Sequence, residues 1–442
     1  MTPGARIQAT IELLGLIAAE PQDASAVIDG YFKSRRFAGA GDRRDVSHRV
    51  YENMRHHARL DWWIERTGVK VDPAPRSRVL AQLAVYERTS PDALASLFSG
   101  TRHCPSPLTE GERELADSLY GRPPQHADMP EWVRLEFPAW MGPSLHAIFG
   151  DRLAEELQAL SQTAPVDIRA NTLKATREAV QAALAADKVE TVPTHLSPLG
   201  LRLTGRARLG GTHAFKQGWF EVQDEGSQLL ALLCGVRPGM TVVDYCAGAG
   251  GKTLALAAAL GPGRVGGGRG RVIACDVSRY RMDRMEPRLR RSGATNVRCQ
   301  VVTARDDSWV KANQAMADRV LVDAPCTGTG AWRRNLDAKW RFQPDDVANL
   351  VETQRLILAQ ASTLVAPGGR LIYATCSLLR EENEDQMAWF QANLPGFTLL
   401  PMPEVWAETV GGPCPAAGDF LRLSPASTDT DGFFCAVLEK PI

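Results

Sequence analysis

Residues 241–253 read TVVDYCAGAGGKT, a short apolar run that ends in an aspartate and passes directly into a glycine-rich turn. The stretch that follows, residues 254–260, is rich in leucine and alanine and favours a helix. Glycines let a backbone approach a ligand closely, and the free amides at a helix start favour an anionic group such as phosphate or carboxylate. These residues therefore predict a strand, a ligand-binding turn and a helix, in that order.

The same alternation of strand, turn and helix continues towards the end of the chain. Apolar runs occupy residues 241–244, 271–276, 319–323 and 370–374, and the first three end in aspartate. Near-continuous apolar strands that alternate with helices are typical of a parallel sheet covered on both faces, where ligands bind at the carboxyl ends of the strands. We therefore predict a mostly parallel, Rossmann-like α/β domain over residues 216–442.

Two further domains are expected before residue 216. Residues 1–140 place apolar side chains at three- and four-residue spacing, which predicts an all-helical domain. Residues 141–215 contain short β-like runs around a helical stretch, which predicts a small α+β module that connects the larger domains and contacts the substrate. Within the α/β domain, the Gly- and Arg-rich stretch 261–270 is expected to be a surface insertion, with an RNA-contacting loop as the alternative.

The composition is that of a globular protein of two or three domains, with 442 residues of which 44% are apolar and 23% charged. No stretch approaches the roughly 18 consecutive apolar residues of a membrane span, and residues 13–19 are too short an apolar run for a secretory signal. We therefore expect a cytoplasmic protein with no membrane partner. The nine cysteines form no CxxC pair, which predicts free thiols and no zinc site.

The positions of the histidines and of the basic residues limit the reactions and ligands that each domain can support. All eight histidines lie at or before His213, so the α/β domain cannot use a Ser-His-Asp triad or a histidine-bound metal. Cysteines, carboxylates or a cofactor must supply its chemistry. In the first domain, residues 33–59 hold eight Lys and Arg against three acidic residues. Such a run is either a solvated helix face or a surface that contacts phosphates.

The spacing of the glycine turn excludes two common nucleotide sites. A Walker A loop needs glycine at the position of Cys246, and a dinucleotide fingerprint needs its third glycine at the position of Thr253. The turn is therefore predicted to hold a different nucleoside ligand. Asp276, at the end of the next strand, is placed to accept hydrogen bonds from ribose hydroxyls. Cys246 lies inside the turn and is expected to pack as a small apolar side chain.

Two cysteines follow strand ends at the same edge of the predicted sheet. Cys326 lies in the loop DAPCTGTG after the third strand, and Cys376 follows the strand 370–374. A thiolate adds reversibly to carbon 6 of cytosine and makes carbon 5 nucleophilic, so the pair predicts methylation at carbon 5. A free thiol is only a few per cent ionised at neutral pH, and Lys252 is the nearest group by motif that could favour the thiolate.

Asp323, three residues before Cys326, is expected to hold the base through its exocyclic amine and its protonated ring nitrogen. Spacing leaves the roles of the two thiols symmetric, because both lie at strand ends that face one crevice. The remaining cysteines are expected to be buried apolar residues.

Seven short motifs stand out between residue 169 and the C-terminus: RANTLK (169–174), FEVQDEGSQ (220–228), DYCAGAGGKT (244–253), DAPC (323–326), NLDAKW (335–340), ATCS (374–377) and EENE (381–384). Together they resemble the signatures of the Sun/Fmu family of RNA cytosine-5 methyltransferases. The helical first domain is similar, more faintly, to the NusB-like RNA-binding domain of the bacterial members that act on small-subunit ribosomal RNA.

This resemblance implies a class I methyltransferase fold with a seven-stranded sheet, S-adenosylmethionine as cofactor and RNA as substrate, with ribosomal RNA favoured over transfer RNA. Apart from the resemblance, we expect a monomer that binds no metal. By the resemblance, Cys376 is the nucleophile, Cys326 assists product release, and Asp323 and Lys252 complete the catalytic group. The cofactor residues expected in this chain are Asp244, Cys246, Ala247, Gly248, Gly250, Gly251, Lys252, Asp276, Arg281, Asp306 and Asp323.

One stretch departs from the family pattern, which often has an Asp-Ala or Asp-Gly pair after the third strand to bind the adenine amine. This chain has TARDD at 303–307, so Asp306 is the adenine candidate that remains. Two rival functions are disfavoured. A DNA cytosine-5 methyltransferase would need a Glu-Asn-Val element that is absent, and a catalytically silent RNA-binding assembly factor would be expected to have lost one of the two cysteines.

Overall fold

The computed structural model describes residues 1–19, 23–71, 74–263, 270–303, 305 and 307–442. Two sequence predictions therefore fall on undescribed positions, Asp306 and most of the insertion at 261–270. Contacts between residues divide the chain into two compact units. Unit 1 comprises residues 1–162 and 332–342, and unit 2 comprises residues 163–331 and 343–442.

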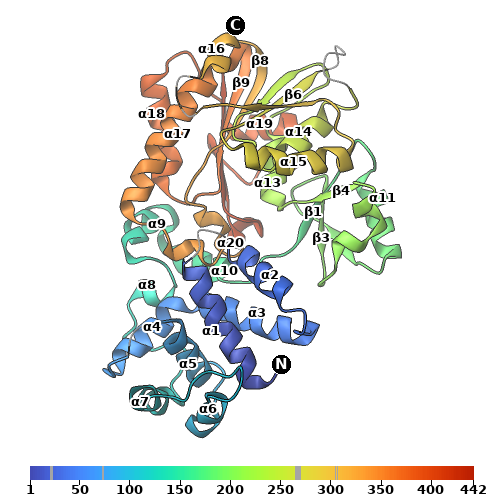
Figure 1. Ribbon diagram of the computed structural model, residues 1–442. Coiled ribbons are helices and arrows are strands. Elements are labelled where there is room, and N and C mark those ends of the chain that lie inside the picture. The colour runs from blue at the N-terminus through green and yellow to red at the C-terminus, as the bar shows by residue number, and fades with distance from the viewer. Residues whose placement is uncertain (20–22, 72–73, 264–269, 304, 306) are drawn as a thin grey trace. The chain divides into compact units, whose positions relative to one another are not determined.

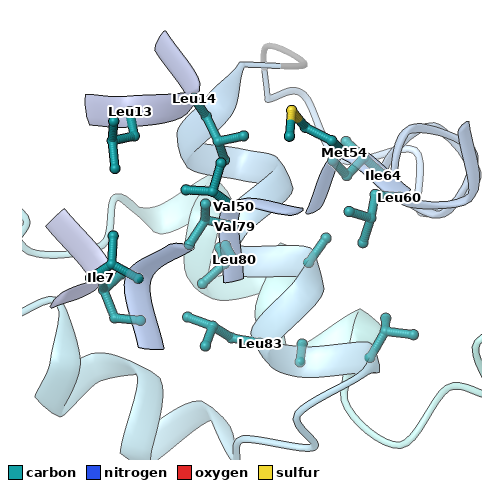
Figure 2. Packing of buried hydrophobic residues seen from close by; sticks show 14 of the residues in the cluster. Ile7, Leu13, Leu14, Val50, Met54, Leu60, Ile64, Val79, Leu80 and Leu83 are labelled. Carbon is teal, nitrogen blue, oxygen red and sulfur yellow. The ribbon is translucent and has the colours of Figure 1, made fainter. Parts of the chain in front are cut away.

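Unit 1 is helical, and its described residues contain no strand. Apolar side chains at three- and four-residue spacing, among them Leu13, Val50, Leu60 and Leu80, are fully buried in one core (Figure 2). Its helices are α1 (Pro3–Ala19), α2 (Ala24–Ser34), α3 (Ala40–Arg55), α4 (His57–Arg66), α5 (Pro75–Val85), α6 (Pro91–Leu97), α7 (Glu110–Leu119), α8 (Glu131–Arg134), α9 (Gly142–Phe149) and α10 (Leu153–Leu160).

Residues 332–342 belong to unit 1 although the surrounding sequence belongs to unit 2. Leu336 joins the helical core, and the Trp340 ring stacks on His57 with the ring centroids 4.9 Å apart. The compact units therefore differ from the three predicted domains. The difference arises from packing. Helices α9 and α10 belong to unit 1, and the apolar side chains of residues 332–342 pack into the same unit.

Unit 2 contains a small antiparallel sheet with strand order β2-β3-β1-β4. Ile168 of β1 and Leu201 of β3, the two central strands, are fully buried together with Val180 and Leu184 of α11. The elements are β1 (Asp167–Ala170), α11 (Arg177–Ala186), β2 (Thr191–Pro193), β3 (Gly200–Leu203), α12 (His213–Lys216) and β4 (Phe220–Val222).

The large sheet of unit 2 has the order β10-β12-β9-β8-β5-β6-β7, with β11 also paired to β12. Strands β5 to β9 are parallel, and β10, β11 and β12 are antiparallel to their neighbours. The strands are β5 (Thr241–Asp244), β6 (Arg271–Asp276), β7 (Val297–Val301), β8 (Ala317–Asp323), β9 (Val365–Thr375), β10 (Thr398–Leu399), β11 (Phe420–Leu423) and β12 (Phe433–Glu439).

The predicted sheet had seven strands, and eight are present. Two short strands share β12: β11 pairs with its residues 433–436, and β10 pairs with its residues 438–439. The seven positions of the Rossmann-like methyltransferase sheet are therefore filled by eight strands.

Helices cover both faces of this sheet, because successive side chains of each strand point to opposite faces (Figure 1). Val242 packs with α13, α14 and α19, whereas Val243 packs with α17 and α18. No helix in the described part of the chain is both long and apolar enough to cross a membrane. The helices are α13 (Glu225–Leu232), α14 (Gly251–Ala259), α15 (Arg279–Ser292), α16 (Ser308–Ala312), α17 (Pro344–Leu364), α18 (Glu384–Asn393), α19 (Met402–Thr409) and α20 (Pro425–Thr428).

Candidate functional site

The turn after β5 needs glycine at two positions. Gly248 and Gly250 have φ angles of 55° and 84°, a region that residues with a Cβ atom rarely adopt. At Gly250 a Cβ atom would also lie 2.4 Å from Cγ of Met285. Gly251 then begins α14, so the free amides of a helix start lie beside the turn.

Asp276, at the end of β6, is held by the backbone of two loops. The Gly248 N–H donates to its Oδ2 at 2.9 Å, and the Ser278 N–H donates to its Oδ1 at 2.7 Å. The Arg281 Nη1 atom lies 3.9 Å from Oδ2 on an otherwise exposed side chain. Each carboxylate oxygen can accept a second hydrogen bond, so Asp276 remains an acceptor for a bound ligand.

A cavity of about 330 Å³ lies at this end of the sheet. Its lining includes four of the predicted cofactor residues, Cys246, Asp276, Arg281 and Asp323. The other described candidates, Asp244, Ala247, Gly248, Gly250, Gly251 and Lys252, lie in or behind the glycine turn and do not line the cavity.

Asp244 ends β5 and is 1% exposed. Its Oδ2 accepts a hydrogen bond of 2.6 Å from the Thr253 hydroxyl, and its Oδ1 has no hydrogen-bond partner among the described residues. Burial raises the pKa of Asp244 to about 7, against the opposing effect of the Thr253 hydrogen bond. A buried acceptor next to the turn is thus left for a bound group.

Lys252, in the first turn of α14, donates a hydrogen bond of 2.7 Å to Oδ2 of Asp323 at the end of β8. Burial opposes the ammonium charge, but the attraction and hydrogen bond of Asp323 raise the pKa of Lys252 above its ordinary value. A negative charge on Cys376 would add to this increase, so the ammonium group favours such a charge on that sulfur.

The two predicted catalytic thiols are in contact, with Sγ of Cys326 3.5 Å from Sγ of Cys376. The loops that carry them are joined by backbone bonds, since the Gly330 N–H donates to the Cys376 carbonyl at 2.9 Å. The hydrogen bond with Cys376 and burial raise the pKa of Cys326 well above its ordinary value. Cys326 is therefore the thiol that keeps its proton, and the Cys376 sulfur can accept a hydrogen bond from it.

A buried polar cluster lies behind the thiol pair. Glu382, in the short 3-10 helix Arg380–Glu382, accepts hydrogen bonds from the Thr327 N–H at 3.0 Å and from Nε2 of Gln354 at 3.0 Å. Gln354 also donates to the carbonyl of Pro325 at 2.9 Å, beside Cys326. All three polar side chains are buried, so the loop of Cys326 is fixed from inside the protein.

The glycine turn is supported from the small sheet as well. Arg288 of α15 donates to the carbonyl of Ala249 at 2.7 Å and to Glu221 of β4 at 3.0 Å, and Arg291 pairs with the same carboxylate. The predicted motif around residue 221 thus positions the turn and does not contact the cavity.

In unit 1 the basic run divides into two kinds of side chain. Arg49 donates to Glu87 at 2.8 Å, and Arg55 pairs with Glu52. Three cations are exposed: Lys33 at the end of α2, Arg36 in the turn that follows, and Arg44 in α3. They form no ion pair with any residue that the structure describes. Between them, in the turn after α2, Phe37 is 74% exposed.

The chain is similar to known methyltransferases. Residues 231–439 match the family described as 16S rRNA methyltransferase RsmB/F, and residues 137–209 match the ferredoxin-like domain of RsmF/B-like methyltransferases. Proteins named ribosomal RNA small subunit methyltransferase B from Sodalis glossinidius and Enterobacter are 35% and 32% identical over 70% of this chain, which spans 66% and 67% of their lengths. The chain belongs to the RsmB/F family.

Similarity to this family extends beyond the catalytic half. The probable ribosomal RNA small subunit methyltransferase B of Synechocystis is 28% identical over 90% of this chain and 91% of its own length. The crystal structure of PH0851 has a TM-score of 0.78 and 28% identity, covering 100% of this chain and 99% of that chain. As a member of the RsmB/F family, the protein uses S-adenosylmethionine.

The residues present fit this cofactor. Asp276 offers a carboxylate to ribose hydroxyls, the amides at the start of α14 suit a carboxylate group, and the unpaired Oδ1 of Asp244 suits an ammonium group. The described residues contain no cluster of three or more His, Cys, Asp or Glu that could hold a metal ion.

Sequence reasoning missed part of this RsmB/F site. Helix α17 lines the cavity with Thr353, Leu356, Ile357 and Gln360, whose spacing marks one helical face and could have indicated a buried wall. The stretch TARDD contributes Thr303 and Arg305 to the lining, while Asp307 caps α16 by accepting from the Trp309 N–H at 2.8 Å.

Proposed function

We propose that this protein methylates carbon 5 of cytosine in RNA, and that the RNA is small-subunit ribosomal RNA. The observation that carries the proposal is the contact of 3.5 Å between the Cys326 and Cys376 sulfurs, at strand ends beside the cofactor cavity. Cytosine carbon 5 needs a nucleophile at carbon 6 before it can be methylated, and a thiol pair supplies one. The names of the relatives support ribosomal RNA as the substrate.

Cys376 is the thiol that adds to carbon 6. Two features support this assignment: the raised pKa of Cys326 keeps that thiol protonated, and the Lys252 ammonium attracts the Cys376 sulfur. The Cys326 S–H can then donate to the Cys376 thiolate until it attacks. Asp323, which is held by Lys252 and lines the cavity, bonds the exocyclic amine of the base.

Bound S-adenosylmethionine supplies the methyl group to carbon 5. After transfer, carbon 5 loses its proton and the bond between Cys376 and carbon 6 breaks, so the thiolate is regenerated and one proton is released overall. Cys326, in contact with Cys376, assists this second half. Cys376 and Cys326 thus divide addition and release between them.

Unit 1 supplies affinity for the RNA. The exposed cations Lys33, Arg36 and Arg44 can contact phosphates, and exposed Phe37 offers a face on which an unpaired base can stack. Arg49, Arg55 and Arg59 serve the fold instead, through bonds to Glu87, Glu52 and the Arg134 carbonyl.

Bisulfite sequencing of total RNA from cells with and without the gene tests the proposal directly. We expect one or more cytosines in small-subunit ribosomal RNA to lose protection when the gene is deleted and to regain it with the wild-type gene. Loss of protection in transfer RNA alone would make transfer RNA the substrate. Unchanged protection at every cytosine would refute cytosine-5 methylation.

A further inference from the structure

A buried carboxylate, Glu382, lies behind the thiol pair and is bonded directly to the loop that carries Cys326. Glu382 is 0% exposed and accepts from the Thr327 N–H and hydroxyl and from Nε2 of Gln354. Thr327 follows Cys326 in sequence, and Gln354 also donates to the Pro325 carbonyl before it. The carboxylate therefore holds the Cys326 loop on both sides of the cysteine.

The same cluster reaches the loop of Cys376. The Thr327 hydroxyl lies 3.2 Å from the Ser377 hydroxyl, and Ser377 follows Cys376 directly. The Leu378 N–H donates to the Thr329 hydroxyl at 2.7 Å. The spacing between the two sulfurs is thus set by hydrogen bonds that converge on or beside Glu382.

No cation neutralises Glu382 among the residues that the structure describes. Its acceptor bonds offset the cost of burying a carboxylate, although burial still raises the pKa of Glu382. The titratable groups that face it are Cys326 and Tyr373, and the Tyr373 hydroxyl donates to the Glu382 carbonyl oxygen at 2.7 Å. The other partners from α17 and the loops are neutral amides and hydroxyls.

Charge is therefore unequal at the two ends of the thiol pair. The Glu382 carboxylate, bonded to the N–H of the residue after Cys326, opposes a negative charge on Cys326, whereas the Lys252 ammonium attracts a negative charge on Cys376. When the pair loses one proton, the remaining proton is shared along the contact of 3.5 Å between the sulfurs. The negative Glu382 near Cys326 and the positive Lys252 that attracts charge on Cys376 together favour the state in which Cys326 keeps that proton.

We propose that Glu382 is a positioning residue that holds the Cys326 loop against Cys376 and directs the negative charge of the thiol pair onto Cys376. The consequence for catalysis rests on the proposed function, because it selects which thiol attacks the base. The arrangement of charge does not depend on the substrate. Glu382 itself is fully buried and does not line the cavity.

Glu382→Gln separates the charge from the hydrogen bonds. The glutamine oxygen can still accept from the Thr327 N–H and from Gln354, and its amide can donate to the Thr327 hydroxyl, which can turn to accept. The matched control is Glu381→Gln, at the exposed neighbouring position. Glu382→Asp is a second variant that keeps the charge and shortens the side chain by one methylene.

The probe is iodoacetamide, applied to the full-length protein without RNA from pH 7 to 11, so that the series extends above the ordinary pKa of a thiol, with the modified cysteines located by mass spectrometry. In the wild type and in Glu381→Gln, we expect Cys376 to be alkylated faster than Cys326. In Glu382→Gln, the inflection of the Cys326 pH profile should fall by about one unit, which increases its alkylation about tenfold at a fixed pH below it. Glu382→Asp should keep the wild-type order.

A loosened loop would increase Cys326 alkylation equally at every pH, without moving the inflection, and would overturn the electrostatic part of the proposal. An unchanged profile in Glu382→Gln would overturn it entirely. If Glu382→Gln does not fold, the proposal requires that Glu382→Asp folds and keeps the order of the two thiols. Since no RNA is present, failure of cytosine methylation would leave this result standing, and the two proposals can fail separately.

Discussion

The Nζ atom of Lys252 lies 2.7 Å from Oδ2 of Asp323, and this ion pair joins the glycine turn to the strand that leads to Cys326. Lys252 comes from the start of α14 and Asp323 from the end of β8, so the contact exists because β5 and β8 are parallel neighbours. One cation thus holds a carboxylate that lines the cavity at the sheet edge and favours a negative charge on the Cys376 sulfur.

Replacing Lys252 by methionine keeps the length of the side chain and removes its charge. We expect methyl transfer to fall at least tenfold and its pH profile to move to higher pH, because the Cys376 thiolate loses the cation that favours it. Single-turnover rates measured across pH would show the shift. A uniform loss of rate with an unmoved profile would mean that Lys252 acts only by holding Asp323.

Asp276 is predicted to bind the ribose of the cofactor. Asp276→Ala removes a charged acceptor, for which a loss of about 1.5–3 kcal/mol is reasonable, so calorimetry should show binding weakened at least tenfold. Asp283→Ala is the control, because Asp283 is exposed on α15 and pairs with Arg279. If both variants bind S-adenosylmethionine like the wild type, the ribose is held elsewhere.

The buried Asp244 should make stability depend on pH. Its pKa rises from 3.8 in the unfolded chain to about 7 in the folded one, so the folded protein holds a proton that the unfolded chain releases between these values. Its contribution is complete below pH 3.8 and is lost as pH rises towards 7, at a rate of at most about 1.4 kcal/mol per pH unit. Denaturant unfolding from pH 4.5 to 7 should show a shallower fall for Asp244→Asn than for the wild type. Equal slopes would mean that Asp244 is charged in the folded protein.

Local sequence patterns predicted the elements that carry the chemistry. The apolar run before the glycine turn became β5, the Asp276 and Asp323 strand ends lie at one cavity, and Cys326 contacts Cys376, because parallel strands align their carboxyl ends. The family and its cofactor are confirmed by the comparisons, whereas the roles of the site residues stay predictions.

Features that depend on distant packing could not be predicted in this way. Nothing local marks residues 332–342 for the helical core, because Leu336 and Trp340 have the same apolar character as residues that pack on a sheet. Glu382 lies in EENE, a motif in which the sequence assigned it no role, and only the fold shows it buried against Thr327. The contribution of α17 to the cavity could not be predicted for the same reason, because tertiary packing decides which face of the helix lines the cavity.

Exposed cations on unit 1 should govern the salt dependence of RNA binding. In Arg36→Gln/Arg44→Gln, the slope of log affinity against log salt should fall by up to about two units, one for each lost phosphate contact. Phe37→Ala should weaken binding at every salt concentration with an unchanged slope, since stacking releases no counterions. Arg66→Gln is the control, because the exposed Arg66 pairs with Asp128. An unchanged slope in the double variant would exclude this surface.

The two thiols should give opposite results when each is replaced, although they lie in contact. Without Cys376 nothing adds to carbon 6, so Cys376→Ala should form neither methylated RNA nor a covalent complex. Without Cys326, addition and methyl transfer can proceed but release should slow, so Cys326→Ala should accumulate a protein–RNA adduct. Denaturing gel electrophoresis with labelled RNA and S-adenosylmethionine separates the two cases.

Cys435→Ala is the matched control for this pair, since Cys435 is a fully buried thiol on β12 and should leave activity and adduct level unchanged. An adduct with Cys376→Ala in place of Cys326→Ala would reverse the two roles, and the charges of Lys252 and Glu382 would then not select the nucleophile. Full activity in both single variants would rule out the two-thiol mechanism, because no other described cysteine contacts this pair of sulfurs.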